Sequence, residues 1–373
     1  MKPKQISPTK LAKPLFLERM QKILSDKKDF QNYLDSLKTE SLKSIRCNTL
    51  KISPQELKKR LEQKNWKVSQ PFSDYPEIII INGKFAHAPN GLLEIKNIND
   101  KKLAEQKIFP SKQLSINNQK NNRAKQDNLT NLEPGEIGNS LEHQLGYYYV
   151  QDISSMMPIL ALNLKPDETF IDLCASPGSK TTQASTKMQN KGLILANEVS
   201  FGRIKILSSN LQRCGVSNTI IIKHDGVALC KRLKKQNFTA DKILLDAPCS
   251  GEGTLKNSIK TYKMWNIKTI KSLAKLQKLL LCSAIEILKP QGEIIYSTCT
   301  HAPEENEEVL NFTLEKFKGK IKIEKINFPL KYREGLVKWE DKKYSKELRK
   351  SCRIYPQDNN TEGFFIAKLK KVK

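Results

Sequence analysis

Hydrophobic residues follow two alternating spacings along the C-terminal part of the chain, which predicts a repeated strand–helix order. Short apolar runs, typical of buried strands, precede segments whose apolar residues recur every three to four positions, as on one helix face. The predicted strands are residues 169–174, 193–199, 219–224, 242–247 and 293–298, and the predicted helices between them are 179–188, 201–214, 226–234 and 267–288. This order favours a parallel sheet with helices on both faces.

The pattern continues to the C-terminus with fewer helices. A helix over residues 304–317 is followed by strands at 320–326 and 363–369, with a long polar excursion between them. We therefore expect an α/β domain with a seven-stranded, mostly parallel sheet, in which five parallel strands are joined by a terminal pair, one of them antiparallel. A further helix starts near Ser154.

The N-terminal part shows shorter elements. Residues 15–37 have the spacing of one or two short helices, and 44–50 alternate as a strand. A helix over 54–64, strands at 66–68 and 77–81, and a turn at Asn82-Gly83 complete a small α+β module over residues 1–97.

Residues 98–136 differ from both flanking regions, because they are rich in Lys, Asn and Gln and have no clear period. We interpret them as a flexible polar insertion or linker, with contact to RNA through the lysines as the less favoured interpretation. The second domain then spans residues 137–373.

The net charge of the 373-residue chain is +26, which indicates a polyanionic partner, most simply a nucleic acid. A generally lysine-rich composition is the alternative explanation. The sequence contains no run of about 18 apolar residues, so we expect no membrane span. The basic N-terminus lacks the apolar core of a signal peptide, and a cytoplasmic location is therefore expected. The eight cysteines form no CxxC pair, so we expect neither a metal site nor a disulfide framework. No oligomeric interface is indicated, so a monomer is expected.

Two predicted strands end in a thiol. The apolar run 243–245 ends in Asp246, Pro248 and Cys249, and the strand 293–298 ends at Cys299. Open α/β sheets bind ligands at the carboxyl ends of their strands, and these two strands are expected to be neighbours. A free cysteine is usually a small buried hydrophobe, but two thiols and a carboxylate in one cleft suggest covalent catalysis.

Three carboxylates follow successive strands in the same way. Asp172 opens a turn of small residues that leads into a helix, Glu198 ends the second strand and Asp225 ends the third. The turn is neither GxGxxG nor a P-loop. Acids in these places are often helix caps, but three in register favour a cofactor that contains adenosine.

Three adjacent tyrosines, Tyr147, Tyr148 and Tyr149, precede the second domain. They are suited to stacking on bases, whereas packing at the domain junction is the favoured interpretation for at least one of them.

The segments 172–182, 246–251, 297–300 and 363–367, together with Arg46-Cys47-Asn48-Thr49-Leu50, resemble the RsmB/NOP2/Sun family of RNA cytosine-5 methyltransferases, which use S-adenosylmethionine. The resemblance covers nearly the whole chain except residues 98–136. It implies a Rossmann-like class I methyltransferase fold with a small, RRM-like α+β N-terminal domain.

The resemblance also implies roles for single residues. Cys299 would be the nucleophile that adds to C6 of cytosine, Cys249 would assist product release, Asp246 would contact the base near N3, and Lys180 would complete the catalytic set. The implied contacts to the cofactor are Cys174, Ala175, Ser176, Pro177, Gly178, Ser179, Lys180, Glu198, Arg203, Asp225 and Asp246. This chain departs from the family pattern at Ser179, where a second glycine is frequent, and at Gln357, where histidine is common. His143 and His301 are interpreted as structural or exposed.

The favoured substrate is tRNA, because a short chain with a compact N-terminal module resembles the archaeal tRNA-type members, and ribosomal RNA is the alternative. In a DNA cytosine methyltransferase the nucleophile follows a proline, as Cys249 does, but the Thr298-Cys299 pair and the N-terminal element argue against that class. A non-catalytic RNA-binding or ribosome-assembly factor is disfavoured, because both cysteines and Asp246 are present.

Overall fold

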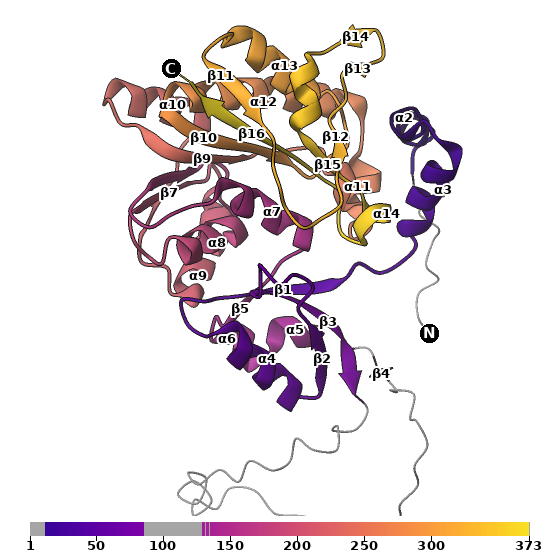
Figure 1. Ribbon diagram of the computed structural model, residues 1–373, viewed down its shortest axis with the longest axis vertical. Helices are drawn as coiled ribbons and strands as arrows, with labels where there is room; N and C mark the ends of the chain where they lie inside the picture. The colour runs from indigo at the N-terminus through magenta and orange to yellow at the C-terminus, as the bar shows by residue number, and fades with distance from the viewer. Residues whose placement is uncertain (1–11, 86–128, 131, 134, 373) are drawn as a thin grey trace, which may run out of the picture.

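A computed structural model describes the chain over residues 12–85, 129–130, 132–133 and 135–372 (Figure 1). These residues form two main sheets and a two-stranded ribbon of β13 (Lys338–Trp339) and β14 (Lys342–Lys343). The larger sheet holds nine strands in the order β12-β15-β16-β10-β9-β6-β7-β8, with β11 beside β16. The strands are β6 (Thr169–Asp172), β7 (Leu193–Asn197), β8 (Thr219–Ile222), β9 (Ala240–Asp246), β10 (Leu288–Thr298), β11 (Ile321–Glu324), β12 (Arg333–Glu334), β15 (Cys352–Ile354) and β16 (Phe364–Lys371).

The parallel core of this sheet confirms the predicted α/β class. The pairs β10–β9, β9–β6, β6–β7 and β7–β8 are parallel, whereas β16 runs antiparallel to β10 and to β11. The expected count of seven strands was wrong. Strands β12 and β15 come from the polar excursion and have only two or three residues, which is too short to show an alternating pattern.

Strand β10 also begins earlier than predicted. Helix α12 (Ile267–Glu286) ends before Pro290, and the strand passes through residues 289–292 with a register shift against β9 between Leu288 and Glu293. A bulge can accommodate proline and glycine within a strand. Pro290 and Gly292 were therefore interpreted as the end of the helix, although they lie inside β10.

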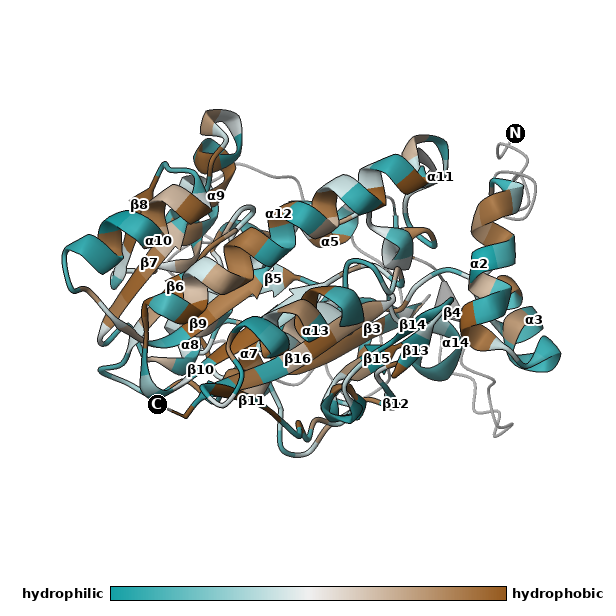
Figure 2. Cartoon of the chain, turned by 90° about the horizontal axis from the view of Figure 1, so that it is seen from above, coloured by the Kyte–Doolittle hydropathy of each residue, from teal (hydrophilic) through white to brown (hydrophobic). Residues whose placement is uncertain are grey.

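Helices cover both faces of the large sheet. Helices α10 (Gly226–Lys235), α12 and α13 (Glu307–Lys316) share one apolar core with the sheet, and α7 (Ile153–Leu162) with α8 (Ser179–Lys187) share another. Helix α9 (Phe201–Cys214) packs against α8. Figure 2 shows β9, β10 and β16 brown along much of their length, whereas α10 and α12 carry teal and brown positions in turn. Both faces of the central strands are therefore buried, as their continuous apolar runs predicted.

The smaller sheet has the order β2-β3-β1-β5, with β4 beside β3. Its strands are β1 (Lys43–Cys47), β2 (Trp66–Ser69), β3 (Ile78–Phe85), β4 (Leu129–Thr130) and β5 (Tyr148–Val150), and its helices are α4 (Pro54–Gln63), α5 (Glu136–Asn139) and α6 (Leu141–Gln144). The Asn82-Gly83 turn was wrong, because β3 continues through it to Phe85, with a register shift in the pairing to β2 between Lys67 and Val68.

The expected domain limits change at both ends of this module. Strand β5 lies beyond residue 137 yet pairs with β1, and β4 comes from the end of the expected insertion; most of that insertion lies outside the described residues. Helices α2 (Pro14–Leu24) and α3 (Lys27–Ser36) pack instead on the large domain, where Phe16 and Tyr33 share a core with Trp265 and Tyr355. Sequence periodicity gives a helix its apolar face but does not give that face its partner.

Gln357 has a defined contact here. Its Nε2 donates to Asp29 Oδ1 at 3.2 Å, and the same oxygen accepts from Arg333 Nη2 at 2.8 Å. The departure from the family pattern at this position thus fixes α3 to the C-terminal segment of this chain.

One of the three adjacent tyrosines, Tyr149, packs at the junction between the small and the large sheet. Tyr148 and Tyr149 are buried, and the Arg46 and Arg213 guanidinium groups each lie 5.5 Å from the Tyr149 ring centre. Tyr147 is partly buried beside Arg60. The junction interpretation is confirmed for Tyr149, whose hydroxyl contacts Pro177 and Asn210 of the large domain, whereas Tyr148 belongs to the core of the small sheet.

Candidate active site

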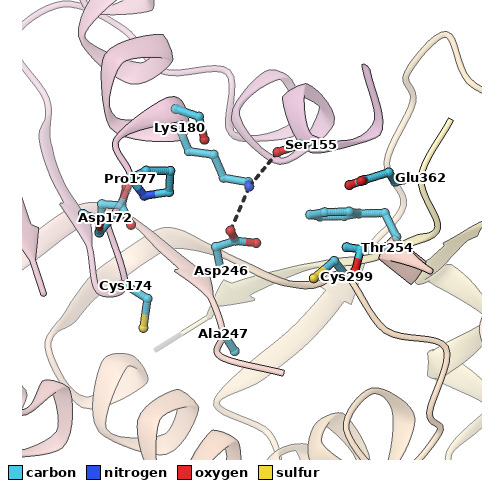
Figure 3. A pocket seen from close by; sticks show the side chains of 14 residues that line it. Ser155, Asp172, Cys174, Pro177, Lys180, Asp246, Ala247, Thr254, Cys299 and Glu362 are labelled. Atoms are coloured by element: carbon cyan, nitrogen blue, oxygen red, sulfur yellow. Dashed lines mark hydrogen bonds and ion pairs between the residues drawn. The ribbon is translucent and has the colours of Figure 1, made fainter. Parts of the chain in front are cut away.

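A cavity of about 200 Å³ opens at the carboxyl ends of β6, β9 and β10 (Figure 3). The predicted residues Cys174, Ala175, Ser176, Pro177, Ser179, Lys180, Asp246 and Cys299 line it, as do Ser155, Asp172, Ala247, Thr254, Glu362 and Phe364. Figure 3 shows Cys174, Asp172 and Pro177 at one end and Cys299, Thr254 and Glu362 at the other, with Lys180 and Asp246 between them. We call these the turn end and the thiol end.

The turn between β6 and α8 forms the wall of the turn end. Gly178 has a φ of +102°, and a Cβ there would lie 3.0 Å from Leu207 Cδ1, so glycine suits both the backbone conformation and the space. Ser179 is the first residue of α8 and needs no such conformation, so serine fits where the family often has glycine. Ser176 is held by Arg203, whose Nη2 donates to the Ser176 carbonyl at 2.6 Å.

Asp172 places a buried carboxyl at the turn end. Its Oδ2 accepts from Thr181 Oγ1 at 2.8 Å, whereas Oδ1 is buried and has no hydrogen-bond partner among the residues that the structure describes. Burial raises the pKa of Asp172 to about 7, and the charge of Asp246 contributes in the same direction. An unpartnered acceptor facing a cavity is suited to a cationic ligand group.

The other two strand-end acids do not line the cavity. Glu198 is buried, accepts from the Ser200 amide at 2.9 Å and lies 3.3 Å from Arg203. Asp225 is exposed and caps α10 by accepting from the Ala228 amide at 2.9 Å. The cap interpretation therefore describes Asp225 in this structure, while Glu198 is joined to the turn through Arg203.

An ion pair crosses the middle of the cavity. Lys180 Nζ lies 2.8 Å from Asp246 Oδ2 and donates to Ser155 Oγ at 2.9 Å. Ser297 Oγ donates to the other Asp246 oxygen at 2.7 Å. Both carboxylate oxygens of Asp246 are thus oriented by donors, and the group is held facing the cavity.

The two thiols meet as predicted, because β9 and β10 are neighbours with Ser297 paired to Asp246. Cys249 Sγ and Cys299 Sγ lie 3.3 Å apart, and Cys299 lines the cavity, whereas Cys249 does not. The hydrogen bond to Cys299, together with burial, raises the pKa of the Cys249 thiol well above its usual range. Cys249 is therefore suited to remain protonated behind the thiol that faces the cavity.

The loop after β9 is fixed by buried partners that the sequence did not reveal. Glu305 Oε2 accepts from the Ser250 amide at 3.0 Å and from Gln277 Nε2 at 2.8 Å. Burial raises the pKa of Glu305 to about 7. The Gly253 amide also donates to the Cys299 carbonyl at 2.9 Å, so the two thiol-bearing segments are joined through their backbones.

Four polar or aromatic residues of the cavity were missed, namely Ser155, Thr254, Glu362 and Phe364. Phe364 belongs to a segment that carried the family resemblance, but nothing in its spacing showed which way the ring points. Ser155 is one of two serines in the first turn of a helix whose remaining residues are apolar, which is the one signal available for it.

Neither histidine reaches the cavity. His301 is buried and stacks on Tyr355 at 4.8 Å between ring centres, and burial lowers its pKa to about 3. His143 packs beside Tyr148. Among the residues that the structure describes, no cluster of three or more His, Cys, Asp or Glu side chains is arranged to hold a metal ion. No helix in that part of the chain is long and apolar enough to cross a membrane.

The sequence matches known families over most of its length. A model of the 16S rRNA methyltransferases RsmB/F matches residues 159–370, and a model of the N-terminal domain of RsmF matches residues 13–73. The tRNA (cytosine(49)-C(5))-methyltransferase of Pyrococcus abyssi is 44% identical over 234 residues, which are 63% of this chain and 73% of that protein. Ribosomal RNA small subunit methyltransferase F of Vibrio parahaemolyticus is 33% identical over 360 residues, 95% of this chain. This chain spans only 62% of that relative's length.

Solved structures agree with these matches. A methyltransferase homolog protein from Pyrococcus horikoshii superposes with a TM-score of 0.73 at 28% identity and covers 100% of both chains. NSun6 from Pyrococcus horikoshii, solved with SFG, superposes with a TM-score of 0.72 at 26% identity and covers 97% of this chain and 98% of that one. The chain belongs to the RsmB/F family of S-adenosylmethionine-dependent RNA (cytosine-5) methyltransferases.

Proposed function

We propose that this chain methylates C5 of a cytosine in tRNA through a covalent bond between Cys299 and C6 of the base. The observation that carries the proposal is the thiol pair. Cys299 follows β10 and faces the cavity, and Cys249, which follows the neighbouring strand β9 three residues after Asp246, lies 3.3 Å behind it. Such a paired arrangement suits a nucleophile that must attack and later leave.

The residues of the turn end fit S-adenosylmethionine. The unpartnered Oδ1 of Asp172 is suited to the α-ammonium group of the cofactor, and the small side chains of residues 174–176 leave the backbone open to close approach. Glu198, Arg203 and Asp225 lie at or after the next strand ends, on the side where a nucleoside would extend. When bound, the cofactor supplies an electrophilic methyl group.

The residues of the thiol end would activate the base. Addition of the Cys299 thiolate to C6 breaks the C5–C6 double bond and places electron density on C5, which otherwise reacts poorly as a nucleophile. Asp246, oriented by Lys180 and Ser297, would contact the ring near N3 and favour the addition.

Product release reverses the addition. Loss of the C5 proton to solvent restores the C5–C6 double bond, and Cys299 leaves with the electron pair of the C–S bond. A protonated Cys249 at 3.3 Å would donate to the departing thiolate and stabilise it. This assigns different roles to two chemically identical groups.

The choice of tRNA is supported by a relative. The Pyrococcus abyssi relative is named for cytosine 49 of tRNA and shares 44% identity. Ribosomal RNA is the second candidate, because the RsmF N-terminal model matches residues 13–73 and the Vibrio relative matches 95% of the chain. The net charge of +26 fits either substrate.

A covalent trap tests the proposal. Cys249→Ala, mixed with total cellular RNA and S-adenosylmethionine, is expected to stall at release and to give an RNA–protein adduct on a denaturing gel, whose RNA is then sequenced. Cys282→Ala is the matched control, because that thiol is buried in α12 away from the cavity, and it should give no adduct.

Three outcomes would contradict parts of the proposal. An adduct from Cys299→Ala but not from Cys249→Ala would reverse the roles of the thiols. A trapped ribosomal RNA would replace tRNA as the substrate. If neither variant traps RNA and the parent transfers no methyl group, the non-catalytic RNA-binding alternative becomes the better account.

A further inference from the structure

We propose that Glu362 makes the enzyme select cytosine over uracil, by accepting a hydrogen bond from the exocyclic N4 amino group of the target base. The inference deepens the proposed function and rests on its assignment of the thiol end as the base site. Glu362 lines the cavity, but the proposed function gives it no part in binding the cofactor or in the reaction of the base.

Glu362 lies at the end of the cavity where the base would react. Figure 3 shows its carboxylate turned toward the cavity, above Cys299 and Thr254 and across from the Lys180–Asp246 pair. The Phe364 ring also lines the cavity, at the start of β16 two residues after Glu362, and lies 5.2 Å from Lys180 Nζ. An aromatic face beside a nucleophile offers a surface on which a base can stack.

The backbone ties Glu362 to the nucleophile. The amide of Gly363 donates to the Gly253 carbonyl, and the amide of Gly253 donates to the Cys299 carbonyl, each at 2.9 Å. The approach is close: a Cβ on Gly363 would lie 2.3 Å from His301 Nε2. Residue 362 therefore has a fixed position relative to Cys299, as a specificity residue requires.

The Glu362 side chain is oriented as well. Asn257 Nδ2 donates to Oε1 at 2.9 Å, and the Glu362 amide donates to Asp152 Oδ2 at 3.2 Å. Among the described residues, Oε2 makes no hydrogen bond. Burial and the charge of Asp152 raise the pKa of Glu362, whereas Asn257 and the Lys180 ammonium favour the ionised form. One carboxylate oxygen is thus left to accept from a ligand.

The chemistry of the two bases gives this oxygen a selective role. A carboxylate only accepts hydrogen bonds. Cytosine presents the N4 amino group as a donor, whereas uracil presents an acceptor, O4, at the same position. With uracil bound, the partly buried Glu362 carboxylate would face the lone pairs of O4 and would lack a hydrogen-bond donor. A site whose acceptor needs a donor from the ligand binds a ligand without that donor much more weakly. Asp246 already has a different contact in the proposed function, the ring near N3, and each of its oxygens also has a donor in the protein, Ser297 or Lys180.

The test compares two RNA transcripts that carry the trapped site, one with cytosine and one with uracil at the target position. Methyl transfer to each is measured for the parent, for Glu362→Gln and for Glu362→Asp. The glutamine amide can donate to O4 while its oxygen still accepts from Asn257, so Glu362→Gln should methylate the uracil transcript about tenfold or more faster than the parent does and the cytosine transcript about tenfold more slowly. Glu362→Asp keeps a carboxylate and should slow cytosine transfer without raising uracil transfer.

Controls separate the possible failures. Glu340→Gln makes the same chemical change at an exposed loop residue and should match the parent on both transcripts. Unfolding temperature and S-adenosylmethionine binding of each variant should stay at the parent values. If Glu362→Gln methylates uracil no faster than the parent, the inference is overturned, whatever happens to the cytosine rate. If the parent itself transfers nothing to the cytosine transcript, the proposed function fails instead.

Discussion

The buried carboxyl of Asp172 should lower the stability of the cofactor-free protein at neutral and alkaline pH. Burial raises its pKa from 3.8 to about 7, so the folded state binds a proton that the unfolded state releases across this range. Stability must then fall as the pH rises from about 4 to about 7 and stay constant above. A pKa difference of one unit is worth about 1.4 kcal/mol, so the whole effect is roughly 4 kcal/mol, of which about 2 to 3 kcal/mol falls between pH 5 and pH 8.

Asp172→Asn removes this effect without changing the shape of the side chain. An asparagine oxygen can still accept from Thr181 Oγ1, and the amide nitrogen would take the place of the unpartnered Oδ1. Between pH 5 and pH 8 the unfolding free energy of the parent should fall by about 2 to 3 kcal/mol more than that of Asp172→Asn.

The assay is urea unfolding of the cofactor-free proteins at several pH values, with S-adenosylmethionine binding measured in parallel. S-Adenosylmethionine binding should weaken in Asp172→Asn even at pH values where the variant is the more stable protein, because the variant lacks the carboxyl group that we propose binds the cofactor's ammonium group. Asp167→Asn, an exposed change on the loop before β6, should show no such pH-dependent difference. Parallel stability curves for Asp172→Asn and the parent would refute the reasoning.

Further predictions concern the thiol end and the RNA. Because the two sulfur atoms lie 3.3 Å apart, diamide should oxidise Cys249 and Cys299 to a disulfide. Methyl transfer should then stop and mass spectrometry should show the loss of two hydrogens, and dithiothreitol should restore the activity and the original mass. Retained activity in the oxidised protein would contradict this prediction. Gly253→Ala places a Cβ 2.1 Å from the Gly363 carbonyl oxygen and should lower both the unfolding temperature and the activity. Gly202→Ala is the control, because no atom of the described residues lies within 4 Å of its new Cβ. It should keep the activity and raise the free energy of unfolding by about 0.5–1 kcal/mol through helix propensity. RNA affinity should fall steeply with salt in gel-shift titrations, by about 1000-fold between 50 and 200 mM if six phosphates are contacted, and a flat salt dependence would exclude the positive charge as the main source of binding.

The sequence predicted the parallel sheet and the thiol pair for one physical reason. The strands that end at Asp172 and Asp246, and the strand just before Cys299, contain apolar runs that are typical of strands buried on both faces. The helices between them require crossover connections, which join parallel strands. The missing parts depend on contacts between distant segments. Strand β15 has three residues and exists because β16 offers it an edge. Glu362 enters the cavity because Gly363 and Gly253 meet through backbone atoms, which no periodicity records.

The N-terminal Arg-x-Asn-x-Leu element shows how the two domains depend on each other. Arg46 is buried, and it donates to the Ser179 carbonyl and to Thr182 Oγ1, each at 2.7 Å, at the start of α8. Asn48 donates to the carbonyls of Gly146 and Cys214, both at 2.8 Å. These side chains are occupied within the protein, so the element joins the small sheet to the turn that walls the cavity. On the proposed function, RNA bound by the N-terminal module would reach the cavity at a fixed distance and orientation. Position would then select the cytosine, and the proposed contact with Glu362 would select its N4 amino group.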